Sequence, residues 1–376
     1  MDKVDSLCLS IIIVSYNTRE VTRNCISSIY QNHPKQPFEV IVIDNNSSDG
    51  TPEAIEREFP GVILIKNTTN SGFAPANNQG IEISKGKYVL LLNSDTLTFQ
   101  NSLDGMMTFM DAHSNVGAVT PRIWLDEGKT LQSHILHPFT VRRFLYEFTP
   151  LGEIFPGNTV YKSMWSKDIR AWLADAPLEV DCFSGACMMV RREALNEVGP
   201  LDERFFMFFE DVDFCMRLKE AGWKFFLVPD AEIVHLAHQS PSNRLQEIYM
   251  DSLAHFLEKH YPFYVRWFLN ASFLFGKVLG KVISNLPIRK ACEDGHVSNI
   301  LSWSRDPAAT GYILEIAVDP SFINKAGNFL RETCYEIPRE ILSRWPKGSY
   351  FWRVAPLMNN GTEGEFSTPK VFRKQG

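Results

Sequence analysis

Residues 38–52 read FEVIVIDNNSSDGTP and hold three structural signals in a row. The run Phe38–Asp44 has the apolar, β-branched composition of a buried strand, and the polar residues 45–49 that follow are typical of a turn. Thr51 with Pro52 at the first helical position, followed by an acidic residue, predicts the start of a helix. The stretch therefore predicts a strand, a polar loop and a helix in sequence.

The same unit recurs on both sides of this stretch. Three further apolar runs, each followed by a polar turn and an amphipathic helical pattern, span residues 9–15, 62–66 and 88–93. Helices are expected from about Thr18 and after Gly72 and Asn101. Such alternation predicts right-handed βαβ units in an α/β fold whose mainly parallel sheet has helices on both faces.

The pattern is less regular after residue 120. Residues 121–177 are irregular and rich in aromatic side chains, which predicts a long excursion on the substrate side of the fold. Regular elements then return. They are a strand at 180–191, a helix to about Val198, a helix at 210–221 ended by Gly222, and strands at 223–228 and 231–236.

The residue pattern changes twice more, near residues 260 and 295, and these changes predict that the chain has three parts. Residues 1–260 form the α/β domain, 261–294 an amphipathic helical linker, and 295–376 a small all-β sandwich with short alternating strands such as 312–318 and 350–355. In the linker, the polar positions Arg266, Asn270, Lys277 and Lys281 recur at spacings of four and seven, which predicts one polar helical face opposite Trp267 and Leu274. So many polar positions favour a helix that lies on a surface over one that crosses a membrane.

Composition excludes several classes of protein. With 376 residues, 44% of them hydrophobic, and a formal net charge of −6, the chain reads as a soluble globular protein without the basic face of a nucleic-acid binder. Seven cysteines without a Cys-x-x-Cys pair predict neither a disulfide framework nor a zinc site, and favour the cytoplasm. The sequence also lacks the glycine-rich turns of dinucleotide oxidoreductases and P-loop NTPases.

Polar residues follow each of the predicted parallel strands, at 15–17, 44–49, 70–72 and 93–95. Each set alone could be no more than turn chemistry. Because the carboxyl ends of parallel strands meet at one edge of a sheet, four such sets together predict a binding site there.

A second cluster lies at residues 204–217, where four phenylalanines and a methionine directly precede Glu210, Asp211 and Asp213. Carboxylates beside so much apolar surface need a compensating helix N-terminus, cation or substrate. Two interpretations remain open from the residues alone: three acids that cap a helix, or part of a catalytic site.

Six segments carry a resemblance to a known family. They are IIIVSYNTREVTRNCISSI, EVIVIDNNSSDGT, NSGFAPANNQGI, YVLLLNSD, FSGACMMVRREAL and FMFFEDVDFCMRLKEAGWKFFLVPDAEIVH. In order and approximate spacing they resemble family 2 glycosyltransferases, especially the bacterial rhamnosyltransferase-like branch, over roughly residues 9–240. The resemblance implies a GT-A fold and an inverting, metal-assisted transfer of a sugar from a nucleoside diphosphate sugar.

The resemblance also implies roles for single residues. Those on the nucleotide-sugar side are Ser15, Tyr16, Asn17, Asp44, Asn46, Asn77, Asn78, Asn93 and Ser94. The family's metal motif, usually Asp-x-Asp, matches residues 93–95, so Asp95 and His235 would hold Mg²⁺ or Mn²⁺, with His238 as the alternative histidine. Asn93 stands where the family has its first acid, which predicts weak metal binding without substrate.

On the acceptor side, the resemblance makes Asp211 the catalytic base and places Glu210 and Gly185 near the acceptor. The start of a helix would compensate the charge of Asp211. Asp213 is expected to cap the helix or to bind acceptor. Cys187 is expected to be a buried structural thiol, because no motif pairs it with a histidine.

The C-terminal region resembles a fibronectin type III domain, through Trp303, the strand that contains Tyr312, and the strand that contains Trp352. The residues and the resemblance together predict a cytoplasmic glycosyltransferase. Its expected partners are a dTDP- or UDP-sugar, plausibly dTDP-rhamnose, and a glycan acceptor linked to a polyprenyl lipid.

Two alternatives stay open. A non-catalytic module that binds sugar nucleotides or glycans would keep the same fold. The acids at Asp95 and Asp211 speak against this alternative, and the departure at Asn93 keeps it open. The linker helix would lie at the inner face of the plasma membrane, or would instead pack on the catalytic domain or bridge to the sandwich.

Overall fold

The computed structural model describes residues 7–149, 159–237, 244–283, 299–319, 322, 325–358 and 363–374, and for 159, 161 and 277–283 it describes the backbone alone. The chain forms two compact units. The first unit contains Met1–Ile123, Leu136–Pro138 and Ala174–His260, and the second contains Trp124–Ile135, Phe139–Leu173 and Tyr261–Gly376.

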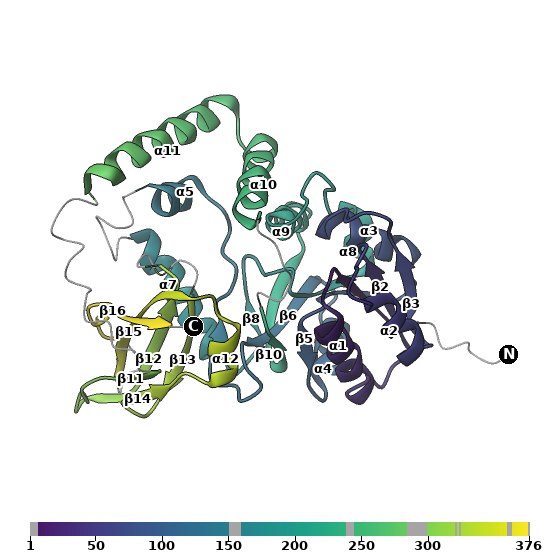
Figure 1. Ribbon diagram of the computed structural model, residues 1–376, viewed down its shortest axis with the longest axis horizontal. Coiled ribbons are helices and arrows are strands. Elements are labelled where there is room, and N and C mark those ends of the chain that lie inside the picture. The colour runs from purple at the N-terminus through teal and green to yellow at the C-terminus, as the bar shows by residue number, and fades with distance from the viewer. Residues whose placement is uncertain are drawn as a thin grey trace. The chain divides into compact units, whose positions relative to one another are not determined.

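The first unit is built on a mixed sheet (Figure 1). Its strands are β1 (Leu9–Ser15), β2 (Phe38–Asp44), β3 (Ile63–Lys66), β4 (Tyr88–Asn93), β5 (Thr96–Thr98), β6 (Val116–Trp124), β8 (Leu178–Glu179), β9 (Cys187–Arg191) and β10 (Lys224–His235). The order is β6-β9-β4-β1-β2-β3, with β10 paired to β5, β6 and β8. The first four strands are parallel to one another, as predicted, but β9 runs antiparallel to β4 and β6. The sheet is therefore mixed.

The first unit has helices on both faces of this sheet. The helices of the unit are α1 (Arg19–Gln31), α2 (Thr51–Glu58), α3 (Phe73–Ile83), α4 (Ser102–Ala112), α8 (Arg192–Val198), α9 (Glu210–Glu220) and α10 (Leu245–His260), of which α10 packs on α9. Apolar residues of α1, α2 and α4 share one core with Leu9, Ile11 and Ile13 of β1. On the other face α3 lies so close that a Cβ at Gly80 would come within 2.5 Å of the Ile12 side chain. The side chains of β1 are thus buried on both faces of the sheet, as expected of a central parallel strand.

Two strand predictions in this unit need correction. The strands predicted at 223–228 and 231–236 are one strand, β10, which continues through Pro229 because proline is tolerated in a strand where its missing N–H is not needed. The strand predicted at 180–191 is confined to β9, because residues 181–186 form a loop, and the short β8 precedes the predicted range. Helices α2 and α9 begin at Thr51 and Glu210, as predicted.

The second unit combines antiparallel strands with helices. The strands are β7 (Gln132–Ser133), β11 (Ile300–Ser302), β12 (Ala309–Ala317), β13 (Lys325–Leu330), β14 (Cys334–Glu336), β15 (Gly348–Met358) and β16 (Lys370–Lys374). The helices are α5 (Val141–Phe148), α7 (Thr159–Trp172), α11 (Phe263–Ile283) and α12 (Arg339–Arg344). One sheet has the order β16-β15-β12-β13-β7, and β11 pairs with β14. Residues of both sheets, among them Leu301, Leu314, Tyr335 and Trp352, share one core. The likeness to a fibronectin type III domain stays a prediction.

The irregular segment predicted at 121–177 holds two helices, α5 and α7, so that prediction was wrong for these residues. The aromatic side chains of these helices obscure the helical period in the sequence. In the structure, these side chains are buried against the other elements of the second unit. Tyr146 and Met164 share a core with Phe322, and Trp172 shares one with Ile313. The boundaries predicted at 260 and 294 stay predictions, and the contacts group segments 124–135 and 139–173 with the C-terminal strands.

A buried ionic cluster strengthens this grouping. Lys325 of β13 lies 2.9 Å from an oxygen of Asp168 in α7 and 3.2 Å from one of Glu315 in β12. Arg353 of β15 lies 2.8 Å from the other oxygen of Glu315. Because a charge that loses its partner in a buried site is costly, this cluster ties α7 firmly to the sheet of the second unit.

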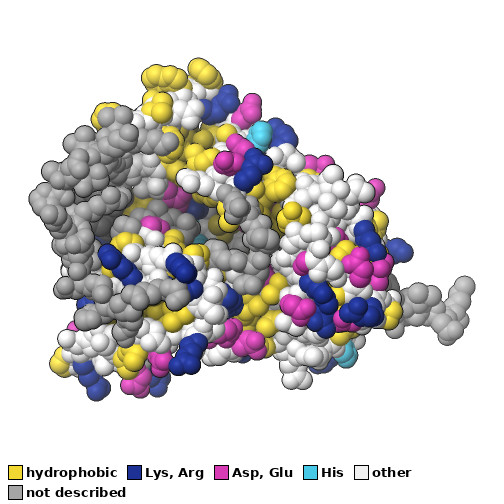
Figure 2. Space-filling view, viewed as in Figure 1, with side chains coloured by type: hydrophobic (Ala, Val, Ile, Leu, Met, Phe, Trp, Pro, Cys, Tyr) yellow, Lys and Arg dark blue, Asp and Glu magenta, His cyan; other side chains and the backbone are white. Residues whose placement is uncertain are grey.

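Helix α11 packs on α5 through one face and leaves a broad apolar face exposed. Figure 2 shows hydrophobic side chains gathered over this helix. Trp267 and Leu274, which were predicted to lie opposite the polar positions, belong to this exposed face. Within the described residues, no helix is long and apolar enough to cross a membrane.

Candidate active site

The carboxyl ends of β1, β2 and β4 bring together most of the predicted polar side chains. At the end of β1, the hydroxyl of Ser15 is buried and lies 3.1 Å from that of Thr18 and 3.0 Å from that of Thr22. The hydroxyl of Ser94, just after β4, lies 3.4 Å from that of Thr18. Sequence reasoning did not single out Thr18 or Thr22, although both lie within one turn of the start of α1.

Asp44 ends β2 and is 1% exposed. Its Oδ2 accepts a hydrogen bond of 2.9 Å from the backbone N–H of Ser47. Its Oδ1 is buried and has no hydrogen-bond partner in the described part of the chain. A buried carboxylate oxygen without a donor is costly, so Asp44 suits a ligand that brings a hydroxyl or an N–H group.

The loops after β1 and β2 hold each other in place. The backbone N–H of Asn17 donates to Ser47 Oγ at 2.8 Å, and Oδ1 of Asn17 accepts from the N–H of Ser48 at 2.7 Å. Asn17 and Asn46 both adopt left-handed backbone conformations, with φ of 51° and 68°, which asparagine tolerates better than most residues. Asn46 is exposed and Tyr16 is half-buried, so both can reach a ligand at this edge.

Asn77 and Asn78 lie on α3 and are buried. The amide of Asn77 donates to the carbonyl of Phe73 at 2.9 Å. Asn78 donates to the carbonyl of Leu201 at 2.8 Å and to Glu203 Oε1 at 3.0 Å, and its own oxygen accepts from the N–H of Leu201. The side chain of Asn78 thus links α3 to the loop 201–203 through hydrogen bonds.

The predicted metal motif and histidine meet in space. Nε2 of His235, the last residue of β10, lies 3.1 Å from Oδ1 of Asp95 and 3.2 Å from Nδ2 of Asn93. The antiparallel pairing of β10 with β5, in register His235 to Thr96, produces this approach. Residues 93–95 and 235, distant in the chain, therefore form one group.

This group fits a divalent cation in part. Neighbouring ligands of an octahedral ion with bonds of about 2.1 Å lie about 3 Å apart, which matches the separation of Asp95 Oδ1 and His235 Nε2. Among the described residues, however, no cluster of three or more His, Cys, Asp or Glu side chains could hold a metal. The protein thus offers two strong ligands, and phosphate oxygens would have to supply others. His238 lies outside the described residues.

The candidate base lies close to this group. Oδ2 of Asp211 accepts a hydrogen bond of 3.0 Å from the N–H of Gly185, and Oδ1 accepts one of 2.8 Å from Val212. The carbonyl of the next residue, Ala186, accepts a hydrogen bond of 3.0 Å from the N–H of Asn93. The carboxylate of Asp211 and the metal motif are therefore linked through two adjacent residues. Gly185, which was predicted to lie near the acceptor, is next to the candidate base.

Glu210 and Asp211 have different surroundings. Glu210 is 5% exposed, and its Oε2 has no hydrogen-bond partner within the part of the chain that the structure describes. Burial raises the pKa of Glu210 well above its usual range, and the nearby charge of Asp211 raises this pKa further. Burial and the charge of Asp211 thus both favour the neutral form of Glu210, while the half-buried Asp211 is oriented by two backbone donors.

The backbone that leads into this pair is strained. Phe208 and Phe209 both have left-handed conformations, with φ of 74° and 67°. For bulky residues such conformations cost about 1–3 kcal/mol each, and they often occur at functional sites. The rings of Phe209, Tyr249 and Phe256 pack together and hold this turn.

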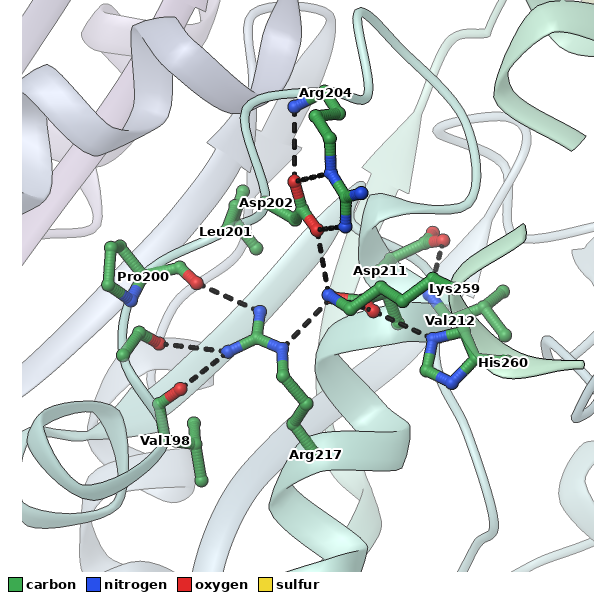
Figure 3. A network of polar contacts seen from close by, with 12 residues as sticks. Val198, Pro200, Leu201, Asp202, Arg204, Asp211, Val212, Arg217, Lys259 and His260 are labelled. Atoms are coloured by element: carbon green, nitrogen blue, oxygen red, sulfur yellow. Dashed lines mark hydrogen bonds and ion pairs between the residues drawn. The ribbon is translucent and has the colours of Figure 1, made fainter. Parts of the chain in front are cut away.

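Asp213 has neither of its two predicted roles. It is 0% exposed, and its oxygens lie 2.9 Å from Arg217 Nε, 2.6 Å from Lys259 Nζ and 2.8 Å from His260 Nε2. Burial alone would raise the pKa of Asp213, but hydrogen bonds from His260 and Lys259 and the charge of Arg217 lower it below its usual value. Figure 3 shows how Lys259 reaches from α10 into this network, which also includes Asp202. Asp213 therefore joins α9 to α10 and does not face an acceptor.

Cys187 is 0% exposed, in agreement with the predicted structural role. Burial raises the pKa of its thiol strongly, so the reactive thiolate is disfavoured.

Comparison with known proteins now adds to this geometry. Residues 10–170 match the family described as Glycosyl transferase family 2. The N-acetylglucosaminyl-diphospho-decaprenol L-rhamnosyltransferase of Mycobacterium tuberculosis is 30% identical over 257 residues, which cover 63% of this chain and 81% of that protein. The chain belongs to glycosyl transferase family 2.

Other relatives of this glycosyltransferase act on sugars according to their names. Rhamnosyltransferase WbbL of Escherichia coli is 27% identical over 236 residues, covering 61% of this chain and 83% of that protein. Among solved structures, the glycosyltransferase is similar to mannosyltransferase PcManGT from Pyrobaculum calidifontis in complex with GDP-Man and Mn²⁺, with 19% identity, 75% and 77% of the two chains covered and a TM-score of 0.43.

Proposed function

We propose that this glycosyltransferase transfers rhamnose, with inversion and with the help of Mg²⁺ or Mn²⁺, from a dTDP- or UDP-linked donor. The proposed acceptor is a glycan on a polyprenyl diphosphate. The support for the sugar and the acceptor is the relative named as an N-acetylglucosaminyl-diphospho-decaprenol L-rhamnosyltransferase.

One observation carries the proposed mechanism. The N–H of Gly185 donates to Asp211, and the N–H of Asn93 donates to the carbonyl of Ala186. These two hydrogen bonds bring a carboxylate beside the Asn93, Asp95 and His235 group. An inverting transfer needs a base on one side of the anomeric carbon and charge stabilisation of the diphosphate on the other. These two groups would supply the two functions at one edge of the sheet.

In the proposed reaction, an oxygen of Asp211 takes the proton of the acceptor hydroxyl as that hydroxyl attacks. The N–H groups of Gly185 and Val212 hold the carboxylate in orientation, so that little reorganisation is needed. The raised pKa of Glu210 would keep that residue neutral beside the Asp211 carboxylate. The phenylalanines before the pair would keep bulk water away from the donor.

On the donor side, the unsatisfied Oδ1 of Asp44 would accept a hydrogen bond from the base or the ribose. The exposed Asn46, with Tyr16 and Asn17, would line the rest of the nucleotide pocket, and Ser15, Asn77, Asn93 and Ser94 would line its floor. Asp95 and His235 would hold the cation, which when bound would neutralise the departing diphosphate.

We place the reaction in the cytoplasm, where nucleotide sugars are made, at the inner face of the membrane that carries the lipid-linked acceptor. This location follows from the proposed substrates.

The test uses the full-length protein with dTDP-rhamnose and a short-chain N-acetylglucosaminyl diphosphate lipid, with Mn²⁺ or with EDTA. We expect release of dTDP that needs both acceptor and Mn²⁺, and a product of inverted anomeric configuration by NMR. A panel of other nucleotide sugars serves as the donor control. If nucleotides bind in a thermal-shift assay but no donor is consumed with any acceptor, the non-catalytic binding module is correct instead.

A further inference from the structure

Helix α11 carries an exposed apolar stripe that neither the fold nor the proposed reaction explains. Six large apolar side chains on it are between 47% and 72% exposed. They are Phe263, Tyr264, Trp267, Phe268, Leu274 and Phe275.

These side chains form a continuous surface. Positions 263, 267 and 274 recur at spacings of four and seven, and positions 264, 268 and 275 repeat the same spacings one residue later. Because a helix has 3.6 residues per turn, each set forms a row along the axis and the two rows are adjacent. The opposite face carries buried Leu269 and half-buried Phe273, whose ring packs on Phe148 of α5. The helix is therefore fixed by one face and presents the aromatic rows with the other.

The charge of this segment indicates what covers the stripe. Residues 263–283 contain Arg266, Lys277 and Lys281 but no Asp or Glu, although the whole chain has a formal net charge of −6. A cationic helix without acids, with Trp, Tyr and Phe on its apolar face, has the composition of a helix that lies in the interface of an anionic bilayer. The helix does not meet the length and hydropathy needed to cross a membrane.

We propose that α11 docks this protein on an anionic membrane, with the six-residue stripe inserted at the level of the lipid headgroups and the cations beside it. The proposal deepens the proposed function, because it names the surface on which a lipid-linked acceptor would be met. It assigns the anchor to the aromatic rows, whereas the lysines alone would give weaker, salt-sensitive binding.

The test is sedimentation of the full-length protein with vesicles of phosphatidylcholine and phosphatidylglycerol, compared with vesicles of phosphatidylcholine alone. The test variant is Trp267→Ser/Phe275→Ser, which replaces residues that are 65% and 67% exposed and should fold normally. The matched control is Ile300→Ser/Val318→Ser, which removes apolar side chains that are 53% and 57% exposed elsewhere in the second unit. Thermal melting checks the fold of both variants.

We expect the wild type and the control to bind the anionic vesicles, and the test variant to bind at least about tenfold more weakly. A Lys277→Glu/Lys281→Glu variant should weaken binding to anionic vesicles and should remove the preference for them. The proposal is overturned if the wild type fails to bind, or if the test variant binds as well as the wild type. It is also overturned if the wild type is a dimer that the test variant converts to a monomer, since the stripe would then be a contact between two copies.

This assay uses neither donor nor acceptor, so its outcome is independent of the reaction. Loss of vesicle binding with normal dTDP release from the short-chain acceptor would separate docking from catalysis. Normal vesicle binding without any sugar transfer would refute the proposed function, while the proposal that α11 docks on a membrane would still hold.

Discussion

At the scale of single residues, the pair Glu210 and Asp211 shows how neighbouring carboxyl groups acquire different properties. Glu210 points into a site where its Oε2 finds no hydrogen bond among the described residues, whereas Asp211 accepts two backbone hydrogen bonds. The sequence identified the pair, but not which member is neutral. That distinction depends on burial, which arises only when α9 is packed.

The raised pKa of Glu210 makes stability depend on pH. An ordinary glutamate has a pKa near 4.5, so the unfolded chain loses this proton above that pH while the folded protein retains it. The free energy of unfolding should therefore fall as pH rises from about 4.5 to the folded-state pKa. Glutamine has no proton to lose, so the melting temperature of Glu210→Gln relative to wild type should increase with pH over this range.

Thermal melting of the two proteins across this pH range is the measurement, with Glu220→Gln at the exposed end of α9 as the control. A constant difference between Glu210→Gln and wild type would contradict the neutral state of Glu210.

Asp213 is expected to matter for stability. Asp213→Asn removes a fully buried negative charge that faces Arg217 and Lys259. Because removal of one partner leaves buried charges uncompensated, we expect the free energy of unfolding to fall by about 3–5 kcal/mol. Urea unfolding measures the loss, and the exposed Glu220→Gln should change it by no more than about 0.5 kcal/mol. Equal stability of the two variants would show that the ion pairs of Asp213 do not stabilise the fold.

At the scale of elements, the turn before α3 and the aromatic loop before α9 depend on each other. Gly72 has φ of 96°, and a Cβ there would lie 2.5 Å from the carbonyl oxygen of Phe206. The same carbonyl accepts a hydrogen bond from the N–H of Phe73. The start of α3 thus positions the loop that leads to Glu210.

A matched pair of glycines tests this coupling. Gly199 has a similar φ of 80° but has no atom within 4 Å of an added Cβ. Gly199→Ala should lower the free energy of unfolding by about 1 kcal/mol, because alanine is strained at a positive φ. Gly72→Ala should lower it further, because the loop that contains Phe206 must also move. Urea unfolding of both variants gives the comparison. If Gly72→Ala is no worse than Gly199→Ala, the loop does not depend on α3.

Elements with one dominant signal could be predicted from the sequence. Strands β1, β2 and β4 are short apolar runs that end in polar turns, and they were predicted with their observed bounds. The sequence pattern did not predict the elements whose burial depends on tertiary contacts. Tyr146 and Trp172 give α5 and α7 an aromatic surface without a clear period, and only the second unit shows what they bury against.

The candidate site shows the same limit. The motif at 93–95 and the histidine at 235 were recognisable, but their approach to about 3 Å depends on the register of β10 against β5. Asn78 matched a motif, yet its contacts with Leu201 and Glu203 could not be inferred from spacing. Lys259 and His260 carry no motif at all, and only the fold reveals that both contact Asp213.

At the scale of the whole molecule, the chain leaves the first unit and returns to it. Segments 124–135 and 139–173 belong with the C-terminal strands, and Lys325 forms an ion pair with Asp168 within that second unit. The second unit thus takes residues from the middle of the chain as well as from its C-terminal part.

A shortened chain tests this organisation. A protein that ends at His260 would lack the strands against which Ile169 and Trp172 are buried, and would leave Asp168 without its lysine. We expect it to aggregate, or to show far less soluble material than the full chain by size-exclusion chromatography. A soluble, monomeric fragment with the melting temperature of the full chain would show that the first unit folds with its excursion intact.

The central claim concerns the whole site: Asp211 acts as the base beside a cation held by Asp95 and His235. Its most direct measurement is the rate of dTDP release by Asp211→Asn with dTDP-rhamnose, acceptor and Mn²⁺, alongside the affinity of each protein for dTDP. We predict a loss of at least about a hundredfold in rate with unchanged dTDP affinity, while Glu210→Gln retains most of the activity. Turnover by Asp211→Asn at the wild-type rate would contradict the account.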